Sequence, residues 1–123
     1  MATPEVPTQL SEIIATITAI APFFLAFSLR ARDLIRKRAG YKSEISGSKD
    51  FLECGHKNHS RKYPGYDNPD NGVLMTIWEH LQDHTNRAND PNLGLNKEQN
   101  DWAIARLKER IKIIEDTGHH QDE

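Results

Sequence analysis

Cysteine is almost absent from this chain of 123 residues, which contains Cys54 and no other. A single thiol excludes an internal disulfide and any zinc site built from four cysteines, and it fits a reducing compartment. Aromatic residues are few, at 7%, and neither sign of charge dominates, because 16 Lys and Arg stand against 18 Asp and Glu. We therefore expect one small soluble domain in the cytoplasm, without the overall positive charge of many nucleic-acid-binding proteins.

Long apolar stretches are also scarce. Residues 13–29 carry no charge, but seventeen residues are short for a bilayer span, and Pro22 interrupts them. Glu5 and Glu12 precede this run, where a signal peptide carries positive charge instead. We expect residues 10–29 to form a helix kinked near Pro22 that packs on the domain or joins two copies in a homodimer. A membrane-tethered effector, anchored through residues 13–29, is the less favoured alternative.

Charge is distributed unevenly along the chain. Residues 30–62 hold ten Lys or Arg against four acids, a local charge of +6, whereas residues 67–123 hold six against twelve, a local charge of −6. Such asymmetry predicts one basic face, which is the usual electrostatic footprint for a phosphate backbone. An uneven but merely solvated surface is the alternative explanation.

The chain divides into three segments by composition. Residues 1–29 are a proline-containing arm followed by the apolar helix, residues 30–115 hold the patterned domain, and residues 116–123 are a polar tail. In that tail, His119 and His120 are expected to be disordered and to have no partner. The middle segment predicts an α+β domain, in which a small hairpin and one helix are flanked by N- and C-terminal helices.

A hairpin followed by a helix is predicted in the middle of the chain. Two short strands, over residues 51–55 and 72–75, are separated by a loop rich in Pro, Asn and Asp. Thr76 and Glu79 then have the spacing of a capping box, which starts a helix directly after the second strand. The last helix begins at Asn96, and its apolar residues recur at spacings of three and four. They are Ile104, Leu107, Ile111 and Ile114.

Four of the six histidines gather around this hairpin and helix: His56, His59, His80 and His84. His80 and His84 are four residues apart, so they share one face of the predicted helix, where two imidazoles can chelate one divalent metal ion or simply decorate the surface. His56 ends the first strand and Asn71 opens the second, so the hairpin can bring both toward that helix. A histidine beside a bound metal can activate water, and an amide can orient a neighbour without adding charge.

This ordered set resembles the HNH endonucleases, also called ββα-metal or His-Me finger proteins, and in particular the HNH proteins often found in phage genomes. The gaps from His56 to Asn71, His80 and His84 are fifteen, nine and four residues, similar to those of colicin-type DNases. The resemblance covers about residues 30–115. It implies a divalent metal ion, Mg, Mn, Ni or Zn, and hydrolysis of phosphodiester bonds in DNA, with RNA not excluded.

Carried over residue by residue, the resemblance makes His56 the general base, Asn71 the orienting asparagine, and His80 and His84 the metal ligands. One departure concerns the residue before the base, which in the family is usually an Asp or His ligand and is Gly55 here.

Two explanations of that departure remain open. Glu53, His59 or water takes the place of the missing ligand, or His59, preceded by Asn58, is itself the base. Because Gly55 removes a ligand, a catalytically weak HNH-fold module that only binds nucleic acid is an alternative function. The expected phosphate contacts, in either case, are Arg61, Lys62, Arg36 and Arg38.

Overall fold

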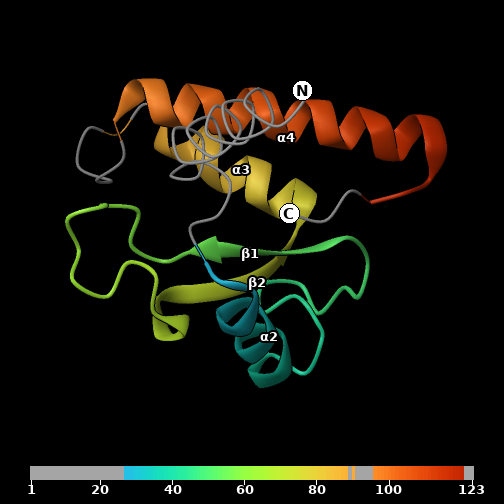
Figure 1. The fold of residues 1–123 in the computed structure, drawn as a ribbon. Coiled ribbons are helices and arrows are strands. Elements are labelled where there is room, and N and C mark those ends of the chain that lie inside the picture. The colour runs from blue at the N-terminus through green and yellow to red at the C-terminus, as the bar shows by residue number, and fades with distance from the viewer. Residues whose placement is uncertain (1–26, 89, 91–95, 121–123) are drawn as a thin grey trace, which may run out of the picture.

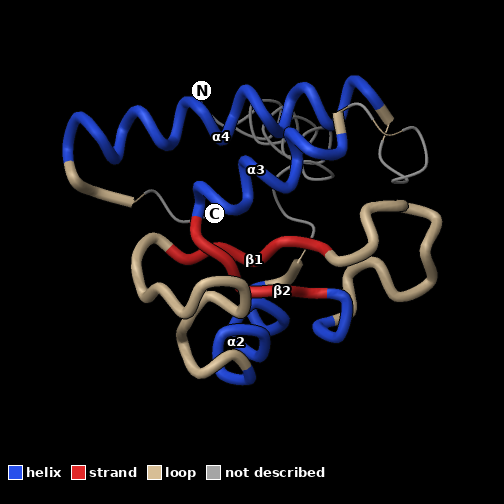
Figure 2. The backbone as a smooth tube through the Cα atoms, turned by 180° about the vertical axis from the view of Figure 1, so that it is seen from behind, coloured by secondary structure: helices blue, strands red, loops and turns tan. Residues whose placement is uncertain are grey.

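A computed structural model of the chain describes residues 27–88, 90 and 96–120. Its elements are α2 (Leu29–Arg38), β1 (Leu52–His56), the 3-10 helix η1 (Pro69–Asn71), β2 (Gly72–Thr76), α3 (Ile77–Arg87) and α4 (Lys97–Thr117). Helices α3 and α4 lie on one side of the two-stranded sheet and α2 lies on the other, as the two opposite views agree (Figures 1 and 2). The expected α+β class is confirmed.

The N-terminal helix predicted for residues 10–29 falls almost entirely outside the described residues, and so does a homodimer formed through it. No helix within the described ranges combines the length and the apolar character that crossing a bilayer requires.

The sheet is a single antiparallel hairpin. Its register runs from Leu52 opposite Thr76 to His56 opposite Gly72. Beyond the last pair, the Lys57 amide donates to the Asn71 carbonyl at 2.8 Å, which carries the pairing into the connecting loop. The loop leaves the sheet at the end where β1 stops and β2 starts (Figure 1). His56 and Asn71 therefore lie at the same end of the sheet.

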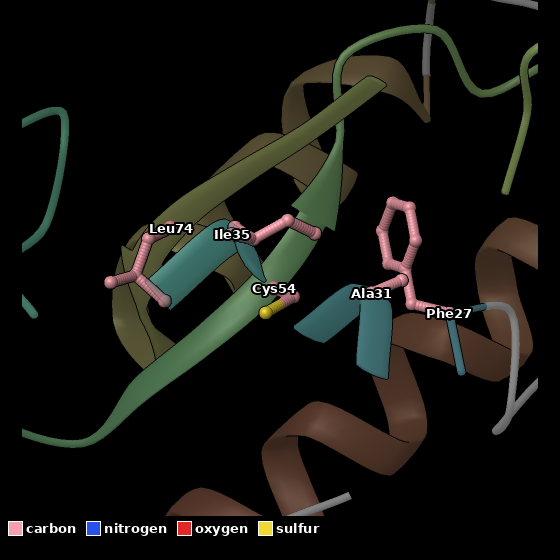
Figure 3. Packing of buried hydrophobic residues seen from close by; sticks show 5 residues of the cluster. All are labelled: Phe27, Ala31, Ile35, Cys54 and Leu74. Carbon is pink, nitrogen blue, oxygen red and sulfur yellow. The ribbon is translucent and has the colours of Figure 1, made fainter. Parts of the chain in front are cut away.

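One face of the sheet packs on α2. The helix begins at the Ser28 cap, whose hydroxyl accepts from the Ala31 amide at 3.1 Å, and its buried face includes Ala31 and Ile35. These side chains meet Cys54 of β1, and Figure 3 shows the cluster, which also contains Phe27 and Leu74. Cys54 is 4% exposed, so the single thiol of the chain is a buried residue of β1.

The other face packs on α3 and α4. The predicted capping box is confirmed, because the Thr76 hydroxyl accepts from the Glu79 amide at 3.1 Å and the Glu79 carboxylate accepts from the Thr76 amide at 2.8 Å. The core on this side is formed by Ile77, Leu107, Ile111 and Ile114, with Leu81 and Phe51 beside it. Trp78 stays 42% exposed, so Leu81 is the better anchor of α3.

Gly72 is the tightest point between α2 and the sheet. A Cβ atom at this position would lie 2.7 Å from Cγ1 of Ile35 and closer still to its Cδ1, and Ile35 is fully buried. We expect Gly72→Ala to destabilise the protein by about 1–3 kcal/mol, because overpacking forces the neighbouring side chain off its rotamer.

Urea unfolding in a double-mutant cycle with Ile35→Ala checks this prediction. Ile35→Ala alone should cost about 2–5 kcal/mol through the cavity it leaves, and Gly72→Ala should cost much less in that background than in the wild type. An equal cost in both backgrounds would show that the Ile35 contact does not limit residue 72.

Candidate metal and catalytic centre

The four histidines of the central segment form one cluster between the hairpin loop and α3. The ring centroids of His80 and His84 are 5.0 Å apart, and those of His59 and His84 are 4.9 Å apart. His56 joins at the edge, with its centroid 6.2 Å from that of His59. His59, His80 and His84 are all buried, at 3%, 9% and 7% exposure. A solvated surface pair is therefore the wrong description of His80 and His84.

A hydrogen bond to Nδ1 fixes the tautomer of each helix histidine. Nδ1 of His80 lies 2.8 Å from Oε1 of Glu53, and an ionised carboxylate can only accept. Nδ1 of His84 lies 2.9 Å from Oδ1 of Asn100, whose amide nitrogen donates to the His84 carbonyl at 2.9 Å and so sets the orientation of the amide. In its neutral form, each ring thus carries its proton on Nδ1 and its lone pair on Nε2, the arrangement typical of metal-ligating histidines.

The spacing of the two rings suits a shared ion. Two imidazoles bound through nitrogen to one tetrahedral metal at about 2 Å have centroids about 5 Å apart, and His80 and His84 show 5.0 Å. No group of three or more His, Cys, Asp or Glu side chains within the described residues is arranged to hold a metal ion. The spacing of His80 and His84 therefore fits a site of two imidazoles.

His59 and Asp83 place two further polar atoms beside this pair. Nε2 of His59 lies 3.1 Å from Oδ2 of Asp83, so these two buried atoms are each other's partner. The other carboxylate oxygen of Asp83 accepts from Arg87 at 3.2 Å. His59 and Asp83 thus lie beside the His80–His84 pair, whereas both oxygens of Glu53 are already engaged by His80, Arg110 and His120.

Gly55 faces His80 from the neighbouring strand. A Cβ atom there would lie 3.5 Å from Cδ2 of His80, but also 2.9 Å from Cε and 3.2 Å from Sδ of Met75. The contacting atoms are the flexible end of Met75, which would have to move to admit a side chain at residue 55.

His56 is held between two aromatic rings. Phe27 stacks on it with centroids 4.0 Å apart, and Tyr66 stacks with centroids 4.1 Å apart, both nearly parallel. Nε2 of His56 is buried and has no hydrogen-bond partner among the described residues. Burial, reinforced by the positive charge that His59 and His80 can carry, lowers the pKa of His56 to about 3. His56 is therefore neutral near pH 7, the form that accepts a proton, but a pKa this far below 7 also makes it a weak base.

Asn71 fixes the loop that carries His59. It is 5% exposed, and its Oδ1 accepts from the Asn58 amide at 2.8 Å. Its Nδ2 donates to the carbonyls of Asn58 at 3.0 Å and of Tyr66 at 2.9 Å. One amide thus joins the start of the loop to the residue that stacks on His56.

The four expected phosphate contacts fall into two groups. Arg61 and Lys62 lie in the same loop, with the Arg61 guanidinium 5.7 Å from the centre of the Tyr66 ring and Lys62 exposed. Arg36 and Arg38 lie on α2. Arg38 donates to the carbonyls of Pro69 at 2.9 Å and Gly72 at 2.8 Å, so it clamps α2 to the start of β2. Arg61 and Lys62 are the better-placed pair.

Several residues of the centre were not predicted from the sequence. His120 was expected to have no partner, and this is wrong, because its Nε2 lies 2.8 Å from Oε2 of Glu53. Asn100 did leave a signal, since it continues the apolar stripe of α4 and is 3% exposed.

The chain matches no protein-family model, no curated protein and no solved structure. The chemistry of the centre therefore rests on its own contacts.

The buried histidines predict a specific loss of stability in mild acid. Burial, with His80 adding to it and Asn100 opposing it, also lowers the pKa of His84 to about 3. The ordinary imidazole value is about 6.5. Between pH 6.5 and about 3, the unfolded chain binds protons at His56 and His84, whereas the folded chain does not. The free energy of unfolding therefore falls as the pH decreases below 6.5.

Urea unfolding with EDTA at pH 7.5, 6.5, 5.5 and 5.0 checks this prediction. We expect the midpoint to fall steadily below pH 6.5, and to do so equally in His119→Ala, whose imidazole is exposed. A midpoint that is constant from pH 7.5 to 5.0 would contradict the neutral, buried state of His56 and His84.

Proposed function

We propose that this chain is a metal-dependent HNH endonuclease that hydrolyses phosphodiester bonds of DNA, with β1, β2 and α3 as its ββα-metal module. The observation that carries the proposal is the pair of Nδ1 hydrogen bonds that leaves Nε2 as the ligand atom of both His80 and His84. A neutral histidine, His56, lies in the same cluster. Histidines on a solvated surface need neither the fixed Nδ1 hydrogen bonds nor a neutral histidine in the same cluster.

His80 and His84 hold the divalent ion in this proposal, with His59 and Asp83 beside them. When bound, the ion stabilises negative charge on the scissile phosphate and on the leaving oxygen. Burial keeps His84 neutral, as its lowered pKa requires, so the ring does not have to lose a proton before it binds.

His56 takes the proton of the attacking water. Stacking by Phe27 and Tyr66 covers both faces of the ring, but the lone pair of an imidazole nitrogen lies in the plane of the ring, so the edge remains the route of approach. The two stacked rings hold the plane of the His56 ring in one orientation, which aligns that lone pair with the approaching water. Asn71 supports the arrangement through the Tyr66 carbonyl.

Phosphate contacts come from Arg61 and Lys62 in the loop. Arg61 also lies over the Tyr66 ring, so the residue that stacks on the base is linked to a residue that can contact the DNA backbone. This pairing places the positive charge of the loop beside the reacting centre.

One observation favours the second candidate function, a module that binds nucleic acid without cleaving it. Residue 55, where the family usually carries a further ligand, is glycine here, so the ion would have fewer protein ligands. Binding of DNA that is independent of metal, with no cleavage, would identify this alternative.

Incubation of supercoiled plasmid with the protein tests the proposed activity. We expect cleavage with at least one of Mg²⁺, Mn²⁺, Ni²⁺ and Zn²⁺ and none with EDTA. His56→Ala should lose about 10²–10⁴-fold in rate, the usual contribution of a general base, while its metal affinity stays close to that of the wild type. Retained activity in His56→Ala together with loss in His59→Ala would transfer the role of base to His59.

Titration calorimetry with Zn²⁺ and Ni²⁺ tests the ligand pair. We expect His80→Ala and His84→Ala each to weaken binding by at least about tenfold, because chelation needs both imidazoles. His119→Ala serves as the matched control, since it removes an exposed imidazole from the tail. An affinity unchanged in His84→Ala would leave His80 as the single ligand of α3.

A further inference from the structure

Glu53 is a fully buried carboxylate in the middle of β1 that joins three other parts of the chain. Its Oε1 accepts from Nδ1 of His80 on α3 at 2.8 Å. Its Oε2 contacts the Arg110 guanidinium of α4, and also Nε2 of His120 at 2.8 Å. The two carboxylate oxygens thus have separate partners. Oε1 is bound to His80 of α3, and Oε2 is bound to Arg110 of α4 and to His120, which follows α4.

His120 reaches this position because the chain turns back after α4. Gly118 closes the helix in the left-handed conformation, with a φ of 72°, and its amide donates to the Ile114 carbonyl at 2.7 Å. Figure 1 shows the chain then running from the end of α4 back toward the sheet. The His120 ring also meets the edge of Phe51, with centroids 5.8 Å apart.

We propose that His120 is a positioning residue of the centre: with Arg110 it holds Oε2 of Glu53, so that Oε1 stays on Nδ1 of His80 and His80 presents Nε2 to the metal. The inference rests on the proposed function for the role of the metal, but the chain of contacts from His120 to His80 exists without it.

The geometry favours positioning over simple packing. A carboxylate held through one oxygen alone can turn about its terminal bond, which moves its acceptor lone pairs out of line with Nδ1 of His80. Arg110 and His120 both contact Oε2 and so oppose that rotation. Nε2 of His120 lies 3.3 Å from Nη2 of Arg110, so the two groups act at one point. His120 itself lies outside the cluster of buried apolar residues, so its polar contacts with Glu53 distinguish its role from core packing.

The test compares four full-length proteins: the wild type, His120→Ala, His120→Gln and His119→Ala. Glutamine keeps a donor that can reach Glu53, and His119→Ala removes the exposed neighbouring imidazole. The first readout is the tautomer of His80 in metal-free protein at pH 8, from ¹⁵N imidazole NMR, assigned with His80→Gln. The second is the Zn²⁺ affinity from calorimetry.

We expect the Nδ1–H tautomer of His80 in the wild type, in His120→Gln and in His119→Ala, and a mixture of tautomers in His120→Ala. Outer partners of metal-ligating histidines typically change affinity 10- to 100-fold. Because Arg110 remains in His120→Ala, we expect a smaller loss of Zn²⁺ affinity, about three- to tenfold.

A wild-type tautomer in His120→Ala would overturn the proposal, whether or not affinity or thermal stability changes. An altered tautomer with a Zn²⁺ affinity equal to that of the wild type would overturn it as well. Failure of the proposed function looks different: the wild type would neither bind metal nor cleave plasmid, and the metal-free tautomer would still report whether His120 controls His80.

Discussion

The hydrogen bond between Glu53 and His80 is the interaction on which the rest of the centre depends. It joins β1 to α3 inside the domain, 27 residues apart in sequence, and it determines which nitrogen of His80 carries the proton. Burial alone would raise the pKa of Glu53, but the bonds from His120 and His80 and the charge of Arg110 outweigh it and lower the value to about 2. The carboxylate is therefore ionised, and a buried charge with these partners is strongly tied to its position.

Two kinds of constraint act on the histidines of the cluster. His80 and His84 are fixed through hydrogen bonds to Nδ1, which set tautomer and direction, whereas His56 is fixed through stacking on both faces of its ring. Ligands of a metal need a defined lone pair, and a base needs to exchange its proton. The different surroundings thus match the different roles proposed for these residues.

Local signals in the sequence predicted much of the fold. Both strands were predicted to within about one residue, since turn-rich sequence bounds them. Thr76 and Glu79 marked the start of α3 because a capping box is a contact between residues three apart. The cluster of histidines followed from the same local elements, because strand ends and one helix face determine which side chains meet.

The partners of those histidines could not be predicted in this way. Glu53 and His120 are 67 residues apart, and Phe27 reaches His56 only because α2 packs across the sheet. Such pairings depend on how whole elements are placed, and no local pattern specifies them. Asn100 was the exception, since a polar residue in the apolar stripe of a helix demands a buried partner.

Anomalous diffraction from crystals of the full chain grown with Zn²⁺ tests the central claim most directly. We expect one strong peak about 2 Å from Nε2 of both His80 and His84, with the Nδ1 bonds to Glu53 and Asn100 intact. Zinc bound only elsewhere, or bound through Nδ1 with those two bonds broken, would contradict the assignment of this cluster as the metal centre.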